Sequence, residues 1–189
     1  AVPFATECRF KDAADRYLWF RLRAVAVWDD GGRPIRLVGT LANITARKIA
    51  EEALLEERHL LRQLIDTIPV NIYFKDLDSR FTLANRAIAR WFGRRSPDEL
   101  IGKTDADFFE PEHAEQARRD EREIIRSGQP LVGEIEKETW SQKQDTWVLT
   151  TKAPLRDRKG HIRGTFGVSS DVTELVRTQR ALHELAAEL

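Results

Sequence analysis

An internal repeat constrains what this chain can fold into more than any other feature of its sequence. Seven residues recur without a gap at an offset of 128 positions, the distance from Trp19 to Trp147. Their first-copy positions are Trp19, Asp29, Gly32, Gly39, Thr45, Ala53 and Leu54, and their second-copy positions are Trp147, Asp157, Gly160, Gly167, Thr173, Ala181 and Leu182. A fixed period defines the unit from which a chain is built. Here each unit is predicted to end in two strands and a helix.

The first copy is predicted to be incomplete, because it starts too close to residue 1 to contain the long segment that precedes the match in the second copy. The sequence also contains no Met. We therefore interpret the chain as a piece of a longer protein. Its expected parts are the C-terminal half of a first domain (residues 1–45), an amphipathic helical connector (46–68), a complete domain (69–174) and the start of an exit coiled-coil helix (175–189).

Composition argues against several classes of protein. Lys and Arg number 31, as do Asp and Glu, so the formal net charge is zero and no basic surface for nucleic acid is expected. The single cysteine, Cys8, rules out an internal disulfide framework and a thiolate zinc site, and it suits a reducing compartment. No apolar run approaches the ~18 residues that span a bilayer. We expect a cytoplasmic segment without nucleic-acid or membrane contacts, although the parent protein could be membrane-anchored.

Strand and turn signals predict an antiparallel hairpin in each copy. Residues 17–27 and 146–155 are rich in aromatic and β-branched side chains and lead into turns that contain Asp and Gly. Residues 35–44 and 162–172 then supply the returning strands.

Both hairpins lead into segments with helical periodicity. Residues 46–67 lack Gly and Pro, and their apolar residues recur at spacings of three, four and seven until Pro69 ends the pattern. Near the C-terminus, Leu175, Leu182 and Leu189 fall seven residues apart, as in a coiled coil. Isolated helices of this length are only marginally stable, so they need a partner surface. Homodimerisation through these helical segments is the expected result.

The complete domain is predicted to be α+β. Its front holds two strands at residues 70–76 and 81–85, followed by short helices and one long helix at residues 111–127 that ends at Gly128. A strand at residues 131–140 precedes the hairpin. Strands, then helices, then three strands indicate an antiparallel sheet packed against helices.

Three segments of the complete domain resemble those of PAS domains, the small sensory modules of bacterial signalling proteins. They are YFKDLDSRFTLAN (residues 73–85), ELIGKTDADFF (99–109) and the terminal DVTE (171–174). The resemblance covers residues 67–174 fully and residues 5–45 as a second, truncated PAS domain, which makes a tandem. It implies a five-stranded antiparallel sheet with short helices on one face and a pocket between them. It also implies flanking signalling helices that lead to an effector such as a histidine kinase or a diguanylate cyclase.

The family's exit motif, Asp-aliphatic-Thr, differs between the two copies. It reads DVT at residues 171–173 and NIT at residues 43–45. Asn43 keeps the hydrogen-bonding shape of the carboxylate but loses its charge, so an ion pair is possible only at Asp171. The resemblance assigns signal relay to Asp171 and Thr173.

The resemblance also implies a ligand pocket on the concave face of the sheet. Strand alternation separates Ile72 and Phe74 from Tyr73 and Lys75, and we assign the first pair, with Val70, to the concave side. The ligand-binding candidates are Ile72, Phe74, Asn85, Trp91, Phe92, Phe108, Leu149, Thr151, Phe166 and Val168, with Thr151, Asn85 and Tyr73 as polar contacts. An aromatic lining also fits an ordinary core, in which each buried side chain contributes ~1.5–3 kcal/mol without any ligand.

Signatures of cofactors and catalysis are weak. Cys8 lies in ECRF, similar to a flavin-photoreceptor segment, but ahead of the hairpin rather than on a helix. His113 lies about a turn too early for the family's haem ligand and is expected at the surface. His183 begins an HEL sequence like the start of a phosphoacceptor box, but two alanines follow. We predict no metal site and no catalytic residues. We also expect no cofactor, with haem and flavin as the less favoured alternatives.

The predicted function is sensory signal transduction. The domain would detect a small molecule or relay a conformational change through its helices, and it would not be an enzyme by itself. Two alternatives remain open at this point. One is a ligand-free dimerisation module, and the other is a haem or flavin redox sensor.

Overall fold

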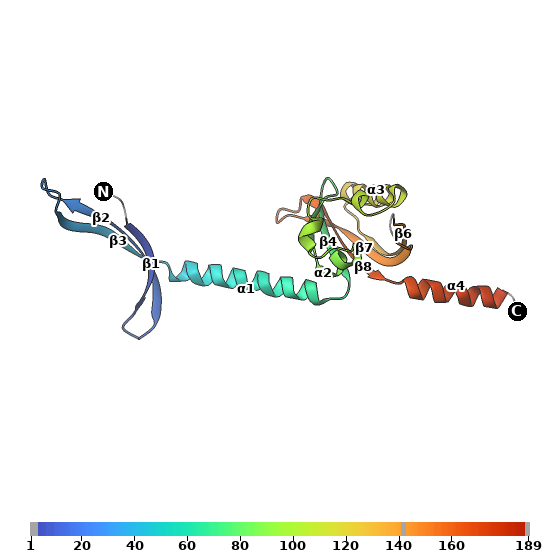
Figure 1. The fold of residues 1–189 in the computed structure, drawn as a ribbon, viewed down its shortest axis with the longest axis horizontal. Helices are drawn as coiled ribbons and strands as arrows, with labels where there is room; N and C mark the ends of the chain where they lie inside the picture. The colour runs from blue at the N-terminus through green and yellow to red at the C-terminus, as the bar shows by residue number, and fades with distance from the viewer. Residues whose placement is uncertain (1–3, 141–142, 188–189) are drawn as a thin grey trace. The chain divides into compact units, whose positions relative to one another are not determined.

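The structure, a computed structural model, describes residues 4–140 and 143–187. The chain divides into two compact units, Ala1–Arg62 and Gln63–Leu189, and the boundary falls within helix α1 (Thr45–Thr67) (Figure 1). Among the described residues no helix is both long and apolar enough to cross a membrane.

The first unit contains an antiparallel sheet of three strands in the order β1-β2-β3. Its strands are β1 (Phe4–Lys11), β2 (Tyr17–Trp28) and β3 (Pro34–Asn43). The hairpin of β2 and β3 agrees with the prediction, whereas β1 is additional, because the residue matches of the repeat begin only at Trp19. Cys8 lies half-buried in β1, so it belongs to a strand.

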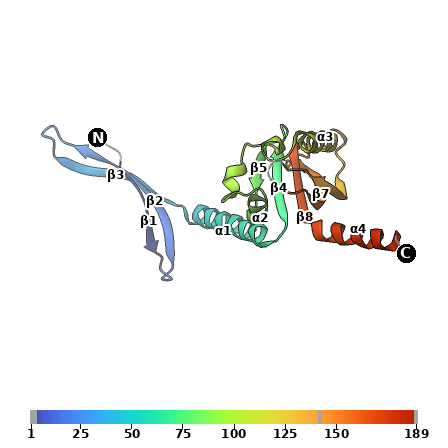
Figure 2. The ribbon, with the colours of Figure 1, turned by 45° about the vertical axis from the view of Figure 1, so that its right-hand side comes forward.

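The second unit contains a five-stranded antiparallel sheet, which confirms the predicted fold class. Its strands are β4 (Asn71–Asp76), β5 (Phe81–Ala84), β6 (Leu131–Glu138), β7 (Thr146–Arg156) and β8 (Ile162–Asp171). Their order is β5-β4-β8-β7-β6, so the first and last strands in sequence lie side by side in the middle (Figure 2). In the repeat, the offset of 128 residues makes β1 of the first unit the counterpart of β6 in the second.

Residues that favour helix ends mark some of the helix boundaries of the second unit. The helices are α2 (Arg86–Trp91), the 3₁₀ turns η1 (Pro97–Leu100) and η2 (Asp105–Asp107), α3 (Pro111–Ser127) and α4 (Thr173–Ala187). Ser96 and Glu99 form a capping box at the start of η1. Helix α3 ends at Gly128, whose φ of 68° lies in the left-handed region that favours glycine. Helix α3 contacts β6, β7 and β8.

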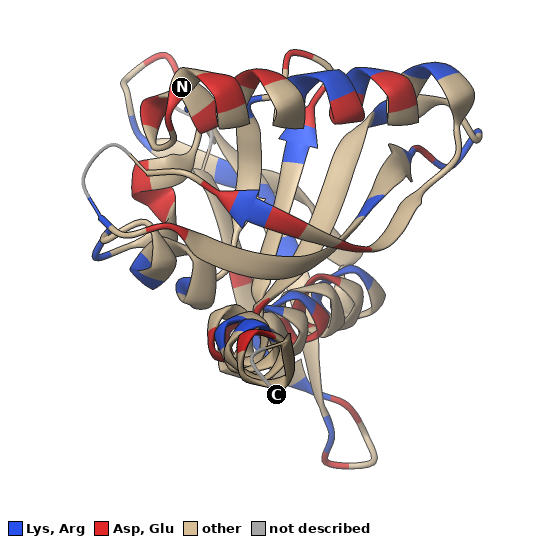
Figure 3. Cartoon of the chain, turned by 90° about the vertical axis from the view of Figure 1, so that its right-hand side faces the viewer, with Lys and Arg blue, Asp and Glu red and all other residues tan. Residues whose placement is uncertain are grey.

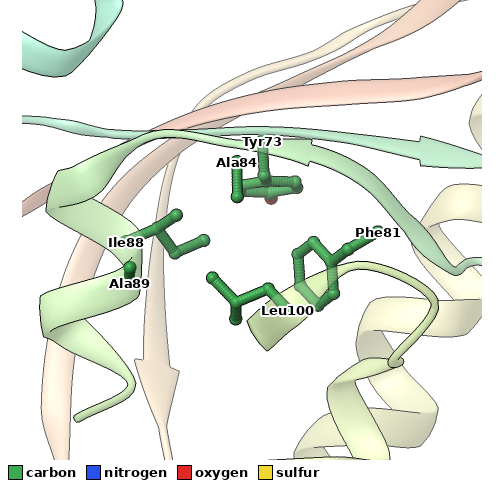
Figure 4. Packing of buried hydrophobic residues seen from close by; sticks show 6 residues of the cluster. All are labelled: Tyr73, Phe81, Ala84, Ile88, Ala89 and Leu100. Atoms are coloured by element: carbon green, nitrogen blue, oxygen red, sulfur yellow. The ribbon is translucent and has the colours of Figure 1, made fainter. Parts of the chain in front are cut away.

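The main hydrophobic cluster lies between β4, β5, α2 and η1. It consists of Tyr73, Phe81, Ala84, Ile88, Ala89 and Leu100 (Figure 4). Phe92 and Phe108 pack against it. Phe81 is 1% exposed, and its ring meets the ring of Tyr73 edge to face at 5.8 Å. This cluster fixes α2 and η1 against one face of the sheet, which we call the inner face.

The assignment of the two faces of β4 from the sequence was wrong. Asn71, Tyr73 and Lys75 are buried on the inner face, while Ile72 and Phe74 are half-buried on the other face. The prediction assumed that a strand lysine points to solvent. Here buried carboxylates compensate the lysine, so the polar set faces the helices and the apolar set faces away.

The strand register shows that the face assignment is also reversed for β7 and β8. Phe74 lies opposite Phe166, Ile72 opposite Val168, and Thr151 also opposite Val168. Residues directly opposite one another in neighbouring strands share a face. Six predicted pocket residues therefore lie on the outer face, namely Ile72, Phe74, Leu149, Thr151, Phe166 and Val168.

Candidate functional site

The space between the inner face and the helices of the second unit is small and polar. This interior cavity has a volume of about 30 Å³. Such a space holds one or two waters, whereas small-molecule pockets commonly measure ~300–1,000 Å³. The polar side chains that line it are Asn71, Tyr73, Lys75, Asp105, His113, Glu121, Glu136, Glu138, Thr150, Lys152 and Ser169. Any occupant would therefore have to be small or would have to displace side chains.

Lys75 is one of the two most deeply buried charges of the cavity, and its side chain, like that of Glu121, is 2% exposed. Its Nζ donates to Asp105 Oδ2 and, at 2.5 Å, to Glu121 Oε1. Burial by itself would lower the pKa of Lys75, but the two carboxylates outweigh it and the pKa is raised. Because Asp105 lies in η2 and Glu121 in α3, this ion-pair cluster ties β4 to both elements.

A second buried lysine extends the same arrangement. Lys152 on β7 is 5% exposed, and its Nζ lies 2.7 Å from Glu136 Oε1 and 3.4 Å from Asp120 Oδ2. Asp120 precedes Glu121 on α3, so consecutive acids of one helix reach lysines on two strands. Acidic and basic residues alternate along α3, the helix at the top of Figure 3. The sheet and α3 are thus held together by charge as well as by apolar contact.

Glu138, at the end of β6, connects the cavity to two indole rings. Its Oε2 accepts hydrogen bonds from Trp91 Nε1 at 3.0 Å and from Thr146 Oγ1 at 2.8 Å. Thr146 Oγ1 in turn accepts from Trp140 Nε1 at 2.8 Å. Burial raises the pKa of Glu138 to about 7, although the hydrogen bonds from Thr146 and Trp91 act in the opposite direction.

Glu138 is expected to make the stability of the second unit depend on pH. Its pKa rises from 4.5 to about 7 on folding, so the folded state holds the proton more tightly and the free energy of unfolding falls as pH rises through this window. The glutamine of Glu138→Gln does not titrate, so the free energy of unfolding of this variant should rise relative to that of wild type as the pH rises. At ~1.4 kcal/mol per pKa unit, this relative increase should be about 3 kcal/mol between pH 5 and pH 8. Urea unfolding at both pH values measures this difference.

Glu134→Gln is the matched control, because Glu134 is exposed on the same strand. Its stability should follow the wild-type pH dependence. Parallel pH profiles for wild type and Glu138→Gln would show that Glu138 ionises freely in the folded protein.

Asn85 has a structural role that leaves nothing free for a ligand. Its Oδ1 accepts from the backbone N–H groups of Ile72 and Ile88, and its Nδ2 donates to the carbonyls of Ile65 and Val70. A side-chain amide has two donors and two good acceptor positions, and all four are used. Asn85 therefore joins the end of α1 to β4 and α2.

The structure brings only part of the predicted pocket together. Trp91, Phe92 and Tyr73 do line the interior cavity, whereas Phe108 lines a separate hollow beyond Phe92. The expectation of a surface His113 was wrong. Its ring is half-buried against Phe109 at 4.4 Å, its Nδ1 lies 3.1 Å from Lys137 O, and burial lowers its pKa.

The charged residues of the cavity were not predicted from the sequence, above all Lys75, Lys152, Glu121 and Glu138. One usable signal was present, since a lysine that alternates with aromatic residues in a strand can face inward when acids are available. Within the described ranges, no three His, Cys, Asp or Glu side chains gather as a metal-binding group.

The last strand and the exit helix meet at a compact hydrogen-bonded junction. Thr173 Oγ1 accepts from Trp147 N at 3.0 Å and lies 3.4 Å from Trp147 O, to which it donates. Asp171 Oδ1 accepts from Thr173 N at 2.9 Å. Val172 N also donates to Trp147 O, at 2.9 Å. We call these contacts the exit junction.

The first unit contains the same junction with one residue changed. Thr45 Oγ1 accepts from Trp19 N at 2.8 Å, Ile44 N donates to Trp19 O at 2.8 Å, and Asn43 Oδ1 accepts from Thr45 N at 2.9 Å. Among the described residues Asp171 makes no ion pair within 4 Å. The shape of the acceptor, which Asn and Asp share, is thus what both junctions use.

Known proteins match the second unit in sequence and in fold. A family model described as "PAS fold" matches residues 65–177. The methanogenesis regulatory histidine kinase FilI of Methanothrix harundinacea is 32% identical over 133 residues, which are 67% of this chain and 15% of that protein. The aerobic respiration control sensor protein ArcB of Escherichia coli K12 is 26% identical, over 70% of this chain and 17% of that protein. The chain thus spans about a sixth of these relatives.

Solved structures agree with this match. A Vibrio cholerae VqmA dimer structure is 28% identical, with a TM-score of 0.54, over 64% of this chain and 52% of that chain. VqmA bound to DPO gives a TM-score of 0.53 at the same identity, over 62% of this chain and 57% of that chain. A PAS domain from Colwellia psychrerythraea shares the fold at a TM-score of 0.53 and 16% identity, covering 64% of this chain and 98% of that one. The family model covers more than half of the sequence, and the chain therefore belongs to the PAS-fold family.

Proposed function

We propose that the chain is a sensory signal-transduction module. It passes a change in the sheet of the second unit through α4 to an effector such as a histidine kinase or a diguanylate cyclase. Relatives of both kinds support this, since FilI and ArcB are a histidine kinase and a sensor protein, and a diguanylate cyclase of Vibrio cholerae is 25% identical. The chain itself is proposed to be non-catalytic and to act in the cytoplasm.

The observation that carries the proposal is the exit junction. Strand β7 holds Thr173, the first residue of α4, by hydrogen bonds to the backbone of Trp147. A shift of β7 or β8 therefore moves the start of α4 directly. Rigid coupling of this kind lets a small change in a packed sheet bias a helix between two arrangements.

The signal is proposed to act at the interior cavity. Its polar lining fits a small hydrophilic molecule, and VqmA, a relative of similar fold, is named as bound to DPO. A haem or flavin would require α2 and α3 to move away from the sheet, because the cavity is only about 30 Å³. Native mass spectrometry and absorbance of the purified chain separate a bound small molecule from a cofactor.

The second candidate is a ligand-free dimerisation module. The exposed leucines of the two flanking helices favour it, namely Leu54, Leu61, Leu64, Leu175, Leu182 and Leu185. Pairing of these stripes in a homodimer would bury apolar surface that water now contacts. The two candidates share the dimer and differ in whether a ligand occupies the cavity.

Asp171→Ala is expected to uncouple the relay, whereas Asp171→Asn should preserve it. The alanine removes the acceptor for Thr173 N, and loss of one such hydrogen bond costs about 1 kcal/mol. Asparagine keeps the acceptor, as Asn43 does in the first unit. The measurement is the signal response of a sensor histidine kinase in which this chain replaces the matching segment, with hydrogen exchange of the first turn of α4.

Glu174→Gln serves as the control, because Glu174 is exposed in the same turn and lies outside the junction. It should leave the response unchanged. Equal responses of Asp171→Ala and Asp171→Asn would reject the role of the hydrogen bond in relay.

A further inference from the structure

A second hollow of the second unit lies outside the interior cavity. It is formed where α2 and the residues after it meet Phe108, Trp140 and Lys143. We call it the aromatic groove, and its volume is about 440 Å³. This size falls within the ~300–1,000 Å³ that is usual for small-molecule sites.

Four aromatic rings form the apolar part of the aromatic groove. Phe92 and Phe108 stack at 4.3 Å with their planes 2° apart, and Trp91 and Trp140 meet edge to face at 6.2 Å. Hydrogen bonds hold both indoles, from Trp91 to Glu138 and from Trp140 to Thr146. Walls that are fixed before binding reduce the entropy lost when a ligand enters.

Three cationic side chains line the aromatic groove, but only one carboxylate, that of Asp107, does so among its described lining residues. They are Arg90, Arg94 and Lys143, and none of them makes an ion pair within 4 Å in the described part of the chain. Lys143 Nζ lies 3.3 Å from the centroid of the Trp140 ring and donates to Trp91 O at 2.7 Å. The groove therefore has an excess of positive charge next to aromatic faces.

Arg94 supplies the observation that points to a ligand. Its Nε is buried and has no hydrogen-bond partner among the described residues, and its guanidinium carbon lies 5.6 Å from the centroid of the Phe108 ring. Folded proteins leave few buried donors unpaired. An acceptor from outside the chain would complete this one once the Arg94 side chain turns its Nε toward the groove.

We propose that the aromatic groove binds a small aromatic carboxylate. The ring contacts the aromatic walls, and the carboxylate accepts hydrogen bonds from Arg94 and takes the positive charge of Arg90 and Lys143. A neutral aromatic amide lacks the charge, and an aliphatic dicarboxylate lacks the ring, so both are excluded as good ligands. Binding at this site does not depend on the relay function proposed above.

The hydrogen bonds of Glu138 give the aromatic groove a connection to the interior cavity. Trp91 lines both spaces and donates to Glu138, and Trp140 reaches the same carboxylate through Thr146. A ligand that moves either indole changes the hydrogen bonding of a group inside the cavity. Intrinsic tryptophan fluorescence therefore reports occupancy without any effector.

The test is a titration of the purified chain with benzoate, benzamide and succinate, followed by calorimetry and tryptophan fluorescence. We expect benzoate to bind with a Kd of about 1 mM or tighter. It should bind about tenfold more tightly than the other two probes, because benzamide lacks the charge and succinate lacks the ring. Arg94→Gln should weaken benzoate binding by about tenfold or more. Circular dichroism and thermal unfolding establish that the variant is folded.

Arg95→Gln is the matched control, because Arg95 is the exposed neighbour of Arg94 and does not line the groove. Its benzoate affinity should equal that of wild type, while Lys143→Gln should weaken binding. Absence of saturable benzoate binding, equal affinities for benzoate and benzamide, or equal effects of Arg94→Gln and Arg95→Gln would each overturn the proposal. None of these outcomes bears on the exit junction.

Discussion

Lys75→Met is expected to lower the free energy of unfolding of the second unit by about 3–5 kcal/mol, the range for removing one partner of a buried ion pair. The side chains of Lys75 and Glu121 are each 2% exposed, and Asp105 is 10% exposed. Without the lysine, two carboxylates face each other in a space that admits little water. Chemical denaturation followed by tryptophan fluorescence measures the loss.

Two comparisons distinguish the effect of breaking the ion pairs from the effect of losing a long side chain. Lys159→Met changes an exposed turn residue and should alter the stability by less than ~0.5 kcal/mol. Replacing Lys75, Asp105 and Glu121 together with apolar residues should restore much of the loss, because no buried charge is then left unpaired.

The Lys75→Met deficit should also shrink at acid pH. In the variant, burial raises the pKa of the Glu121 carboxyl above its unfolded value, so folding is favoured where Glu121 is protonated and is weakened as pH rises. The difference from wild type should therefore be smaller at pH 4 than at pH 7. A deficit below 1 kcal/mol at pH 7 would mean that water or other groups already compensate Asp105 and Glu121.

Phe81→Ala is expected to cost about 3–5 kcal/mol, the usual range for a fully buried phenylalanine. Phe81 is 1% exposed, and its ring lies 5.8 Å from Tyr73, 6.0 Å from Phe92 and 6.2 Å from Phe108. Lys75 Nζ also lies 4.7 Å from the centroid of its ring. The substitution would leave a cavity at the centre of the hydrophobic cluster, which thermal unfolding detects.

Phe166→Ala makes the same chemical change on the outer face. Phe166 is half-buried and stacks on Phe74 with the ring centroids 5.6 Å apart. Because less area is removed from water there, its loss should be under about 2 kcal/mol. Equal losses for the two variants would contradict the assignment of Phe81 to the inner core and Phe166 to the outer face.

Much of the secondary structure was predictable because local signals mark its ends. Helix α3 coincides with the predicted residues since Pro111 starts it and Gly128 stops it. Strand β1 was not predicted because none of the matching residues of the repeat lies in it, although the offset of 128 residues relates it to β6.

The candidate site was less predictable because its residues meet through tertiary contacts. Lys75 finds its partners 30 and 46 positions later in the sequence, at Asp105 and Glu121. Strand alternation gives two sets of side chains but does not say which set is buried, and a lysine biases that choice toward solvent. The inversion of the faces in β4 then placed six sheet residues of the predicted pocket on the wrong side, whereas Tyr73 does line the cavity.

The position of β4 beside β8 has a consequence for how the protein is made. The ribosome releases β4 early, but the strand that covers one of its edges is the last of the sheet to appear. Pairings between distant segments slow folding and leave partly made chains with open strand edges. Strand β8 is also the strand that leads into α4. Helix α4 therefore emerges only after every strand needed to close the sheet has been synthesised.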